Sequence, residues 1–315
     1  MKTRYLLQVY GRQFGTLFGL IALSIVLWIL TPHFMTVSNL LNVAQQTAIV
    51  AIIAAGMTFV IITAGIDLSV GSVLAFSGVV MATLLLRGLP LGLALLSGVG
   101  TGLFCGLING LLISVGRLPP FIATLGMMSV ARGAALVFTE GRPVSGFSDS
   151  FRQIAVGEVL RIPAPVVIML AVYLIAHFVL TRTKLGRYTY AIGGNEEAAI
   201  LSGVNVRLYR TLVYGLCGGL SGLAAIILTA RLNSAQPIAG IMYELDAIAA
   251  VVIGGTSLIG GEGTVFGTLI GALIMGVLRN GLTLLGVSSF VQQIVIGSVI
   301  IVAVLFDMAW KTNRK

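Results

Sequence analysis

The sequence predicts an all-α integral membrane protein with about ten transmembrane helices. Of its 315 residues, 57% are hydrophobic and only 9% are charged, whereas soluble domains carry roughly 25% charged residues. The charged residues cluster between long apolar runs, as expected when each run lies in lipid and each cluster lies in water. The 40 glycines fit the same class, because small residues let membrane helices approach closely.

The apolar runs define ten candidate spans, because a spanning helix needs roughly 20 apolar residues. The spans begin near Phe14, Ala44, Leu68, Leu91, Phe121, Pro165, Thr211, Leu245, Val265 and Ser289. Only the segment 64–67 separates the second span from the third, and only 260–263 separates the eighth from the ninth. Either break could therefore lie within the membrane. The first run lacks a small-residue cleavage site, so we interpret it as a retained span rather than a signal peptide.

The distribution of Lys and Arg predicts that both termini lie in the cytoplasm. Ten spans place both ends on one side, and cytoplasmic segments of membrane proteins are enriched in Lys and Arg. With the N-terminus inside, most of the 19 Lys and Arg residues fall in inner segments, and the densest cluster lies in the loop 181–210. The Lys and Arg residues of the inner segments thus explain the net charge of +9, and we predict no nucleic-acid partner.

Two loops are long enough to do more than connect spans. The inner loop, 181–210, contains a predicted short helix that Asn195 caps, with Glu196 and Glu197 in its first turn, where carboxylates suit the helix dipole. Gly203 is expected to end this helix. The outer loop, 139–164, is rich in Gly and Pro and is predicted to be an irregular surface segment.

Glycine spacing predicts close packing of the fourth span. Its glycines recur every four residues and so form a smooth stripe on one helix face, which would also let two helices slide against each other; they are Gly98, Gly102, Gly106 and Gly110. The fourth span also contains Asn109-Gly110-Leu111, and the ninth contains Asn280-Gly281-Leu282. This match hints at an inverted repeat, a frequent transporter architecture.

Polar residues within the apolar runs are candidates to line a translocation pathway. Asp67 is an ionisable group at membrane depth, which is a functional hypothesis by default; the alternative is that it caps the following helix. Uncharged candidates are Asn42, Gln45, Gln46, Thr47 and Asn109. The alternative for each of these is a hydrogen bond between helices.

The sequence lacks the signatures of an enzyme. The two histidines, His33 and His177, have no Cys or carboxylate at metal-ligand spacing. Neither a G-x-S-x-G nucleophile motif nor a G-x-x-x-x-G-K-[ST] phosphate loop occurs, so we predict no cofactor and no ATP hydrolysis by this chain. Besides Asp67, the spans offer mainly Arg132 and Arg279 as ionisable groups. Ion-driven transporters usually carry more, so the energy is expected to enter through another chain.

Three motifs in order resemble the permeases of the ribose-type family of bacterial ABC sugar importers. They are Gly65-Ile66-Asp67-Leu68-Ser69-Val70-Gly71-Ser72; Leu185-Gly186-Arg187-Tyr188 leading to Gly193-Gly194-Asn195-Glu196; and Glu244-Leu245-Asp246-Ala247-Ile248-Ala249-Ala250 leading to Gly254-Gly255-Thr256-Ser257. The resemblance covers nearly the whole chain. It implies one transmembrane permease domain over 1–315, similar to type II ABC importers, with 181–210 as a cytoplasmic coupling loop.

The resemblance also implies the partners and the mechanism. Such permeases form homodimers in the bacterial inner membrane, bind a cytoplasmic ATPase subunit, and receive a sugar such as ribose from a periplasmic binding protein. Glu197-Ala198-Ala199 followed by Gly203 matches the Glu-Ala-Ala-x-x-x-Gly pattern of a helix that docks into the ATPase, although no Ile-x-Leu-Pro follows. The residues implied in coupling are Asn195, Glu196, Glu197, Ala198, Ala199 and Gly203. Transport would proceed by alternating access.

Three alternatives remain at this point. A secondary transporter would need no ATPase and would work from an ion gradient. An intramembrane enzyme would need a paired nucleophile and base or a metal set. A branched-chain amino-acid permease would share the general layout, but the segments 66–69 and 191–196 fit the sugar group better.

Overall fold

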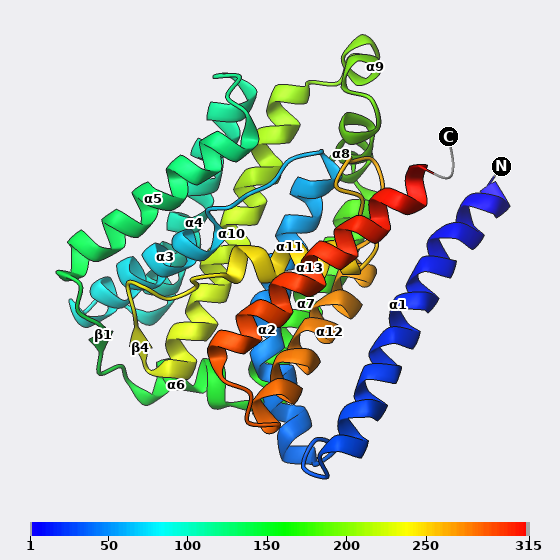
Figure 1. Cartoon of the computed structure of the whole chain (residues 1–315). Coiled ribbons are helices and arrows are strands. Elements are labelled where there is room, and N and C mark those ends of the chain that lie inside the picture. The colour runs from blue at the N-terminus through cyan, green and yellow to red at the C-terminus, as the bar shows by residue number, and fades with distance from the viewer. Residues whose placement is uncertain (1, 313–315) are drawn as a thin grey trace.

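The computed structural model describes residues 2–312, with side chains for 14–305, as a bundle of helices with a few very short strands (Figure 1). In chain order the elements are α1 (Lys2–Leu30), α2 (Val37–Ile62), α3 (Val70–Leu86), α4 (Leu91–Ser114), α5 (Pro120–Thr139), β1 (Val144–Ser145), α6 (Asp149–Val156), β2 (Glu158–Val159), β3 (Ile162–Pro163), α7 (Ala164–Arg182), α8 (Lys184–Gly194), α9 (Glu196–Leu201), α10 (Val206–Leu232), β4 (Ser234–Ala235), α11 (Tyr243–Ile253), α12 (Val265–Leu284) and α13 (Ser289–Thr312).

Each of the ten predicted spans corresponds to a helix, but these helices differ in length. Among the described residues, α2, α4, α5, α7, α10 and α12 are long and apolar enough to cross a membrane, and the apolar parts of α1, α3 and α13 are somewhat shorter. The eighth predicted span is α11, which has 11 residues. At 1.5 Å per residue it reaches only about 16 Å, so α11 alone does not match a full span.

Two buried helices, α2 and α10, form the centre of the bundle. They pack on each other, and α10 also packs on α3 and α4 while α2 packs on α11 and α12. The stretch of α2 from Thr47 to Ile62 is buried almost throughout, including its polar Thr58. A helix that is apolar on all sides is buried on all sides, and this property places α2 in the core.

The glycine stripe of α4 faces α10 across a very close contact. A Cβ atom at Gly102 would collide with the carbonyl oxygen of Gly218, and one at Gly106 would collide with that of Tyr214. The contact is mutual, because a Cβ at Gly218 would collide with the carbonyl oxygen of Gly102. Only glycine allows the two backbones to approach this closely.

The two ends of the bundle differ in their loops. In Figure 1, α9 lies at the same end as the start of α1 and the end of α13, whereas α6 and the strands β1 and β4 lie toward the other end. The sequence predicted that the segment 139–164 is irregular, and this prediction is wrong. The segment contains α6, the paired strands β2 and β3, and β1, which pairs with β4 after α10. Phe151 and Ala155, one turn apart on α6, are buried in an apolar cluster with Ile226 and Ala230 of α10, which orders this segment.

Replacing Gly102 with Leu should disrupt the α4–α10 contact, because the new side chain must displace backbone atoms of α10. We expect a loss of at least about 1–3 kcal/mol of stability, the usual range for overpacking. The measurement is thermal unfolding of the purified protein in detergent. Gly100→Leu is the matched control, since a Cβ there meets nothing within 4 Å; equal effects of the two substitutions would contradict the role of the contact.

Candidate coupling segment and interior polar sites

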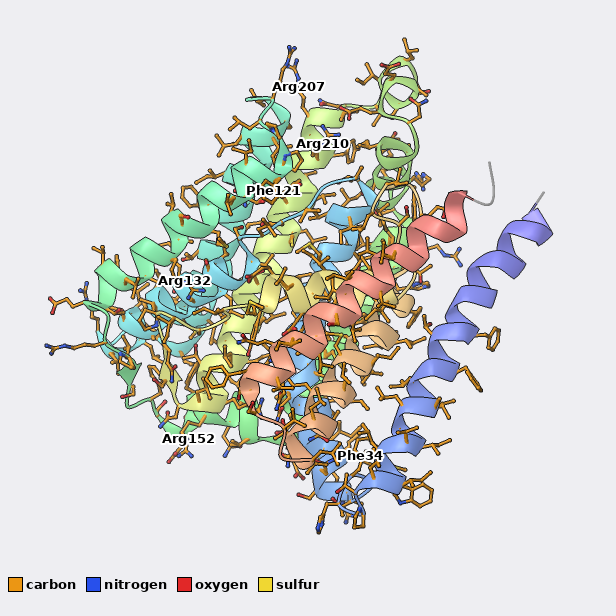
Figure 2. The ribbon with its side chains drawn as sticks, viewed as in Figure 1. Phe34, Phe121, Arg132, Arg152, Arg207 and Arg210 are labelled. Carbon is orange, nitrogen blue, oxygen red and sulfur yellow. The ribbon has the colours of Figure 1, made fainter. Side chains whose placement is uncertain are left out.

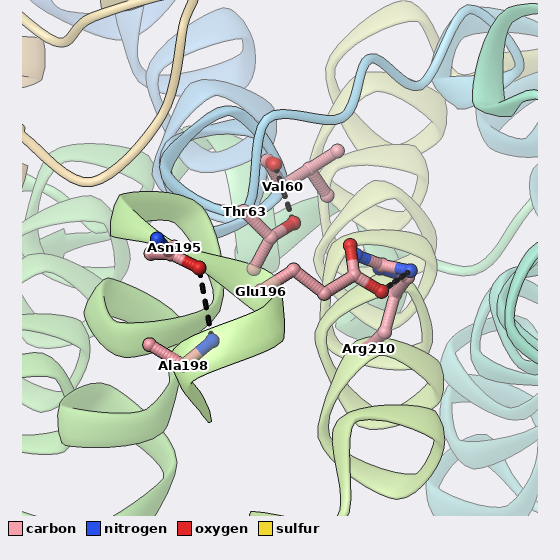
Figure 3. A network of polar contacts seen from close by, with 6 residues as sticks. All are labelled: Val60, Thr63, Asn195, Glu196, Ala198 and Arg210. Atoms are coloured by element: carbon pink, nitrogen blue, oxygen red, sulfur yellow. Dashed lines mark hydrogen bonds and ion pairs between the residues drawn. The ribbon is translucent and has the colours of Figure 1, made fainter. Parts of the chain in front are cut away.

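The segment 181–210 folds into two short helices with defined caps. The hydroxyl oxygen of Thr183 accepts a 3.4 Å hydrogen bond from the Gly186 N–H at the start of α8. At the start of α9, Asn195 Oδ1 accepts from the Ala198 N–H at 2.9 Å (Figure 3). Gly203 then follows α9 with a φ of +79°, a left-handed conformation that favours glycine. The predicted helix and its Asn195 cap are thus observed, whereas α8 was not predicted.

One face of α9 is anchored and the other is exposed. Ala199 is buried in a small apolar cluster with Ile192 of α8 and Val206 of α10. Glu197, Ala198, Ile200 and Leu201 are exposed, and Leu201 is 88% exposed. Exposed apolar side chains on a charged loop are a feature of surfaces that bind another protein, so α9 presents a candidate docking surface.

Glu196 and Arg210 connect α9 to α10. Both guanidinium NH groups of Arg210 donate to the carboxylate of Glu196, at 3.2 and 2.6 Å (Figure 3). The Glu196 side chain is 46% exposed, so the pair stabilises the fold by at most about 1 kcal/mol. Its bidentate geometry nevertheless fixes the orientation of α9 relative to α10.

The C-terminal end of α8 lies against both predicted breaks. The Gly261 N–H donates to the Ile62 carbonyl at 2.9 Å, so the break after α2 and the break before α12 contact each other. A Cβ at Gly193 would collide with the same Ile62 carbonyl oxygen and approach the Gly261 nitrogen. In addition, the Tyr190 hydroxyl donates to the Gly263 carbonyl at 2.6 Å. The segment 181–210 therefore contacts both interruptions directly.

Asp67 lies in a buried polar cluster between α2 and α3. Its Oδ1 accepts from the Ser69 N–H at 2.9 Å and from the Ser69 hydroxyl at 2.6 Å, and that hydroxyl oxygen accepts from Asn109 Nδ2 at 2.9 Å. The alternative that Asp67 is the helix cap is wrong in detail, because α3 begins at Val70 with Ser69 at the cap position. Asp67 instead closes a turn before the helix, since its carboxylate bonds the N–H two residues on.

The beginnings of α3 and α11 face each other in the interior. A Cβ at Gly71 would collide with the Gly240 carbonyl oxygen and lie 2.7 Å from the Glu244 carboxylate. Arg132 of α5 donates to the carbonyls of Pro237 and Ala239, both at 2.7 Å, and so holds the segment that precedes α11. Figure 2 shows Arg132 at mid-height of the bundle, far from Arg207 and Arg210 at the α9 end.

A second pair of charged side chains joins α11 to α12. Arg279 donates to both carboxylate oxygens of Asp246, at 2.8 and 2.7 Å. The Asp246 side chain is 6% exposed and that of Arg279 is 42% exposed. The sequence offers Arg279 only as an isolated ionisable group in a span, because a partner 33 residues away on another helix leaves no local spacing signal.

The predicted pathway residues do not converge on one site. Asp67 and Asn109 share the buried cluster described above. The other four lie along α2: Asn42 and Gln46 are exposed, Gln45 is half-buried, and Thr47 is buried. Among the described residues the hydroxyl of Thr47 has no hydrogen-bond partner. It lies directly against Gly276 of α12. Asn280, the counterpart of Asn109 in the matched motif, exchanges two hydrogen bonds with Asn39 at 3.0 and 2.9 Å.

Long apolar helices, two interruptions that contact each other and a capped loop helix at one end together define a multi-pass membrane permease. Comparisons with known proteins agree. A family model described as the permease component of the branched-chain amino acid transport system matches residues 39–304, and the chain belongs to this family.

Relatives within the family carry sugar-transport names. The chain is 50% identical over 308 residues to the ribose import permease protein of Escherichia coli strain K12, covering 96% of each chain. It is 51% identical over 298 residues to the ribose import permease protein of Bacillus subtilis strain 168, covering 94% of this chain and 92% of the relative. It is 42% identical over 301 residues to the D-allose transport system permease protein of E. coli K12, covering 95% and 92%. The resemblance to ribose-type ABC permeases is thereby confirmed.

Replacing Arg279 with Gln should destabilise the protein, because it leaves the buried Asp246 carboxylate without its partner. We expect a loss of about 1–3 kcal/mol, less than for a fully buried pair because Arg279 is half-exposed. The double variant D246N/R279Q should be less destabilised than the sum of its single variants, as measured by thermal unfolding.

The matched control is Arg152→Gln, which breaks the exposed pair of Arg152 with Asp149. Its effect should stay within about 0.5 kcal/mol. Additive effects of the two substitutions at Asp246 and Arg279 would show that the pair contributes no coupling energy.

Proposed function

We propose that this chain is the permease subunit of a binding-protein-dependent ABC importer that carries a monosaccharide, ribose or a related pentose or hexose, into the cytoplasm. The observation that carries the proposal is 50% identity to a ribose import permease over 96% of both chains. The low charge of the spans also supports it, because a neutral polyol needs hydrogen-bonding groups along its path rather than fixed charges. ATP hydrolysis would reside on a partner ATPase.

The proposed docking surface for the ATPase is α9 with its flanking residues, Asn195 to Ala199 and Gly203. Its anchored Ala199 and its exposed Glu197 and Ala198 support this role. Movement of α9 would pass through α8 to the two breaks, since Gly193 packs on Ile62 and Gly261. This contact gives a direct route from ATP binding on the partner to the helices around a transport path.

The proposed path runs from the interruptions, beside Asp67 and Asn109, along α2 toward its start, and includes Asn42, Gln45, Gln46, Thr47, Asp67 and Asn109. Half-helices whose ends meet within the membrane form substrate sites in several transporters, and the facing starts of α3 and α11 are consistent with this. The ten-crossing count requires that α11 cross together with the chain that precedes it. An inverted repeat is supported by the packing of α10 on α3 and α4, which parallels that of α2 on α11 and α12.

The proposed assembly is a homodimer of permeases in the bacterial inner membrane, with both termini and α9 in the cytoplasm. The excess of Lys and Arg on the α9 side supports this orientation. A periplasmic sugar-binding protein would deliver the substrate to the opposite end. The whole chain, 1–315, would act as one permease domain in which 181–210 is the coupling loop.

Transport can be tested in proteoliposomes that contain the permease, its cognate ATPase and its binding protein. We expect uptake of radiolabelled ribose that requires ATP and continues after ion gradients are collapsed. Uptake driven by an ion gradient without ATP would identify a secondary transporter instead. Preferential uptake of leucine over ribose would favour the amino-acid function in the family's description and overturn the sugar assignment.

Replacing Ala198 with Trp should uncouple transport from ATP hydrolysis. The side chain is exposed, so the fold should persist while the bulky ring blocks close docking. We expect ATP-dependent uptake to fall roughly tenfold or more, since losing a packed interface contact of about 1.4 kcal/mol or more changes an equilibrium by that factor. Ala171→Trp, exposed on the long apolar helix α7 away from both ends of the bundle, is the control. Unchanged uptake by the Ala198 variant would remove α9 from the interface.

A further inference from the structure

A large cavity opens at the α9 end of the molecule. Its volume is about 1050 Å³, and it lies between the end of α2 with the residues that follow, the α4–α5 connection, and the segment from Ile192 to Tyr214. This volume is at the upper end of the range for small-molecule sites, roughly 300–1000 Å³. None of the six proposed pathway residues lines it, so its features call for a separate explanation.

The walls of the cavity carry an excess of positive charge. Arg117, Arg207 and Arg210 line it, against a single carboxylate, Glu196. Glu196 is already bound by Arg210. Arg117 and Arg207 have no carboxylate partner in the part of the chain that the structure describes. Two guanidinium groups are thus available to an anion.

The backbone adds to this positive potential. Asn205, the cap residue of α10, and Val206, its first residue, line the cavity, as do Pro119 and Pro120 at the start of α5. The N-terminal end of a helix carries a partial positive charge that favours anions. Both helices are long, with 20 residues in α5 and 27 in α10, so each contributes a full dipole end.

An independent observation at the cavity also indicates a ligand. Tyr214 is among the lining residues, yet it is 0% exposed and its hydroxyl has no hydrogen-bond partner among the described residues. A buried hydroxyl without a partner destabilises a protein by about 1–3 kcal/mol. A bound polyol or phosphate oxygen would satisfy this group.

We propose that the cavity binds a phosphate monoester of a small polyol, such as a sugar phosphate, from the cytoplasm. Arg117 and Arg207 would bind the phosphate, because the planar guanidinium matches phosphate oxygens in bidentate fashion. Tyr214 and Asn205, which both line the cavity, would bind the polyol hydroxyls. Phosphoryl transfer to an imported sugar is the class of reaction that produces such a ligand.

The position of the cavity makes a bound ligand inhibitory. One ligand would contact the α2–α3 linker, the α4–α5 connection and the α9–α10 segment at once. These are the parts that must move relative to each other if α9 transmits ATP binding to the interior. Binding to one arrangement of these parts stabilises that arrangement, so accumulated sugar phosphate would slow further import. This regulatory part rests on the proposed function, whereas the binding site does not.

Binding can be measured without transport. Isothermal titration calorimetry of the full-length permease in neutral detergent should detect saturable binding of D-ribose 5-phosphate, with inorganic phosphate as a weaker competitor and unphosphorylated D-ribose as none. Arg117→Gln and Arg207→Gln should each weaken binding roughly tenfold, the effect of one charge-assisted bidentate contact. Tyr214→Phe should weaken it severalfold without loss of folded protein, because the hydroxyl lacks a partner.

Two further variants sharpen the assignment. Glu196→Gln removes the carboxylate that occupies Arg210, so it should strengthen binding, opposite in sign to the arginine variants. Arg161→Gln, in the β2–β3 turn outside the cavity lining, is the matched control and should leave binding unchanged. Absence of binding, or binding that is insensitive to both Arg117→Gln and Arg207→Gln, would overturn the proposal.

A competition experiment in lipid nanodiscs distinguishes a soluble sugar phosphate from a lipid headgroup as the ligand. In nanodiscs of phosphatidylcholine, D-ribose 5-phosphate should bind as in detergent, and phosphatidylglycerol should not compete. Competition by phosphatidylglycerol together with loss of ribose 5-phosphate binding would assign the cavity to a lipid headgroup and overturn the proposal for a soluble ligand. In proteoliposomes, ribose 5-phosphate on the ATP side should lower uptake by the unsubstituted protein and not by Arg117→Gln. Failure of uptake itself would affect only the transport function, since calorimetry does not depend on it.

Discussion

The contact around the Ile62 carbonyl is the constraint on which the proposed coupling depends. One carbonyl at the end of α2 accepts the Gly261 N–H and lies against the backbone of Gly193. Three segments far apart in the sequence therefore meet without an intervening side chain. Closely packed backbones cannot absorb a displacement by small deformations. If α8 moves, both interruptions must therefore move with it, or the contact at Ile62 must break. Helix α8 and the two interruptions are thus connected mechanically.

The remainder of the bundle combines close backbone packing with few charges. Glycines bring α4 and α10 together. Interior charges bind specific partners: Arg279 binds Asp246, and Arg132 binds the carbonyls before α11. These charges stabilise the broken helices, which leave backbone groups that lipid cannot satisfy. Arg117 and Arg207, which have no carboxylate partner among the described residues, line the cavity at the α9 end.

Much of the architecture could be predicted because it depends on local pattern. The apolar runs located the helices of the ten predicted spans, and Asn195 with Glu196 and Glu197 located α9 and its cap, since capping is decided within four residues. Where the pattern was weak, the prediction failed. The Gly and Pro residues of 139–164 masked the pattern of α6, which is ordered because Phe151 packs on α10. The apolar run of the eighth predicted span did not show that its helix, α11, is short.

The sequence by itself determined that this protein is a multi-pass permease, which stretches of it form the apolar helices, and to which family it belongs. Only the tertiary structure decided which polar groups meet. Asn109 reaches Ser69 across 40 residues, Arg279 reaches Asp246 across 33, and Gly261 reaches Ile62 across a still longer separation. Hydrophobic periodicity predicts which face of a helix is buried. A hydrogen bond between distant segments depends instead on how the helices cross, and the packing of the whole bundle sets that geometry.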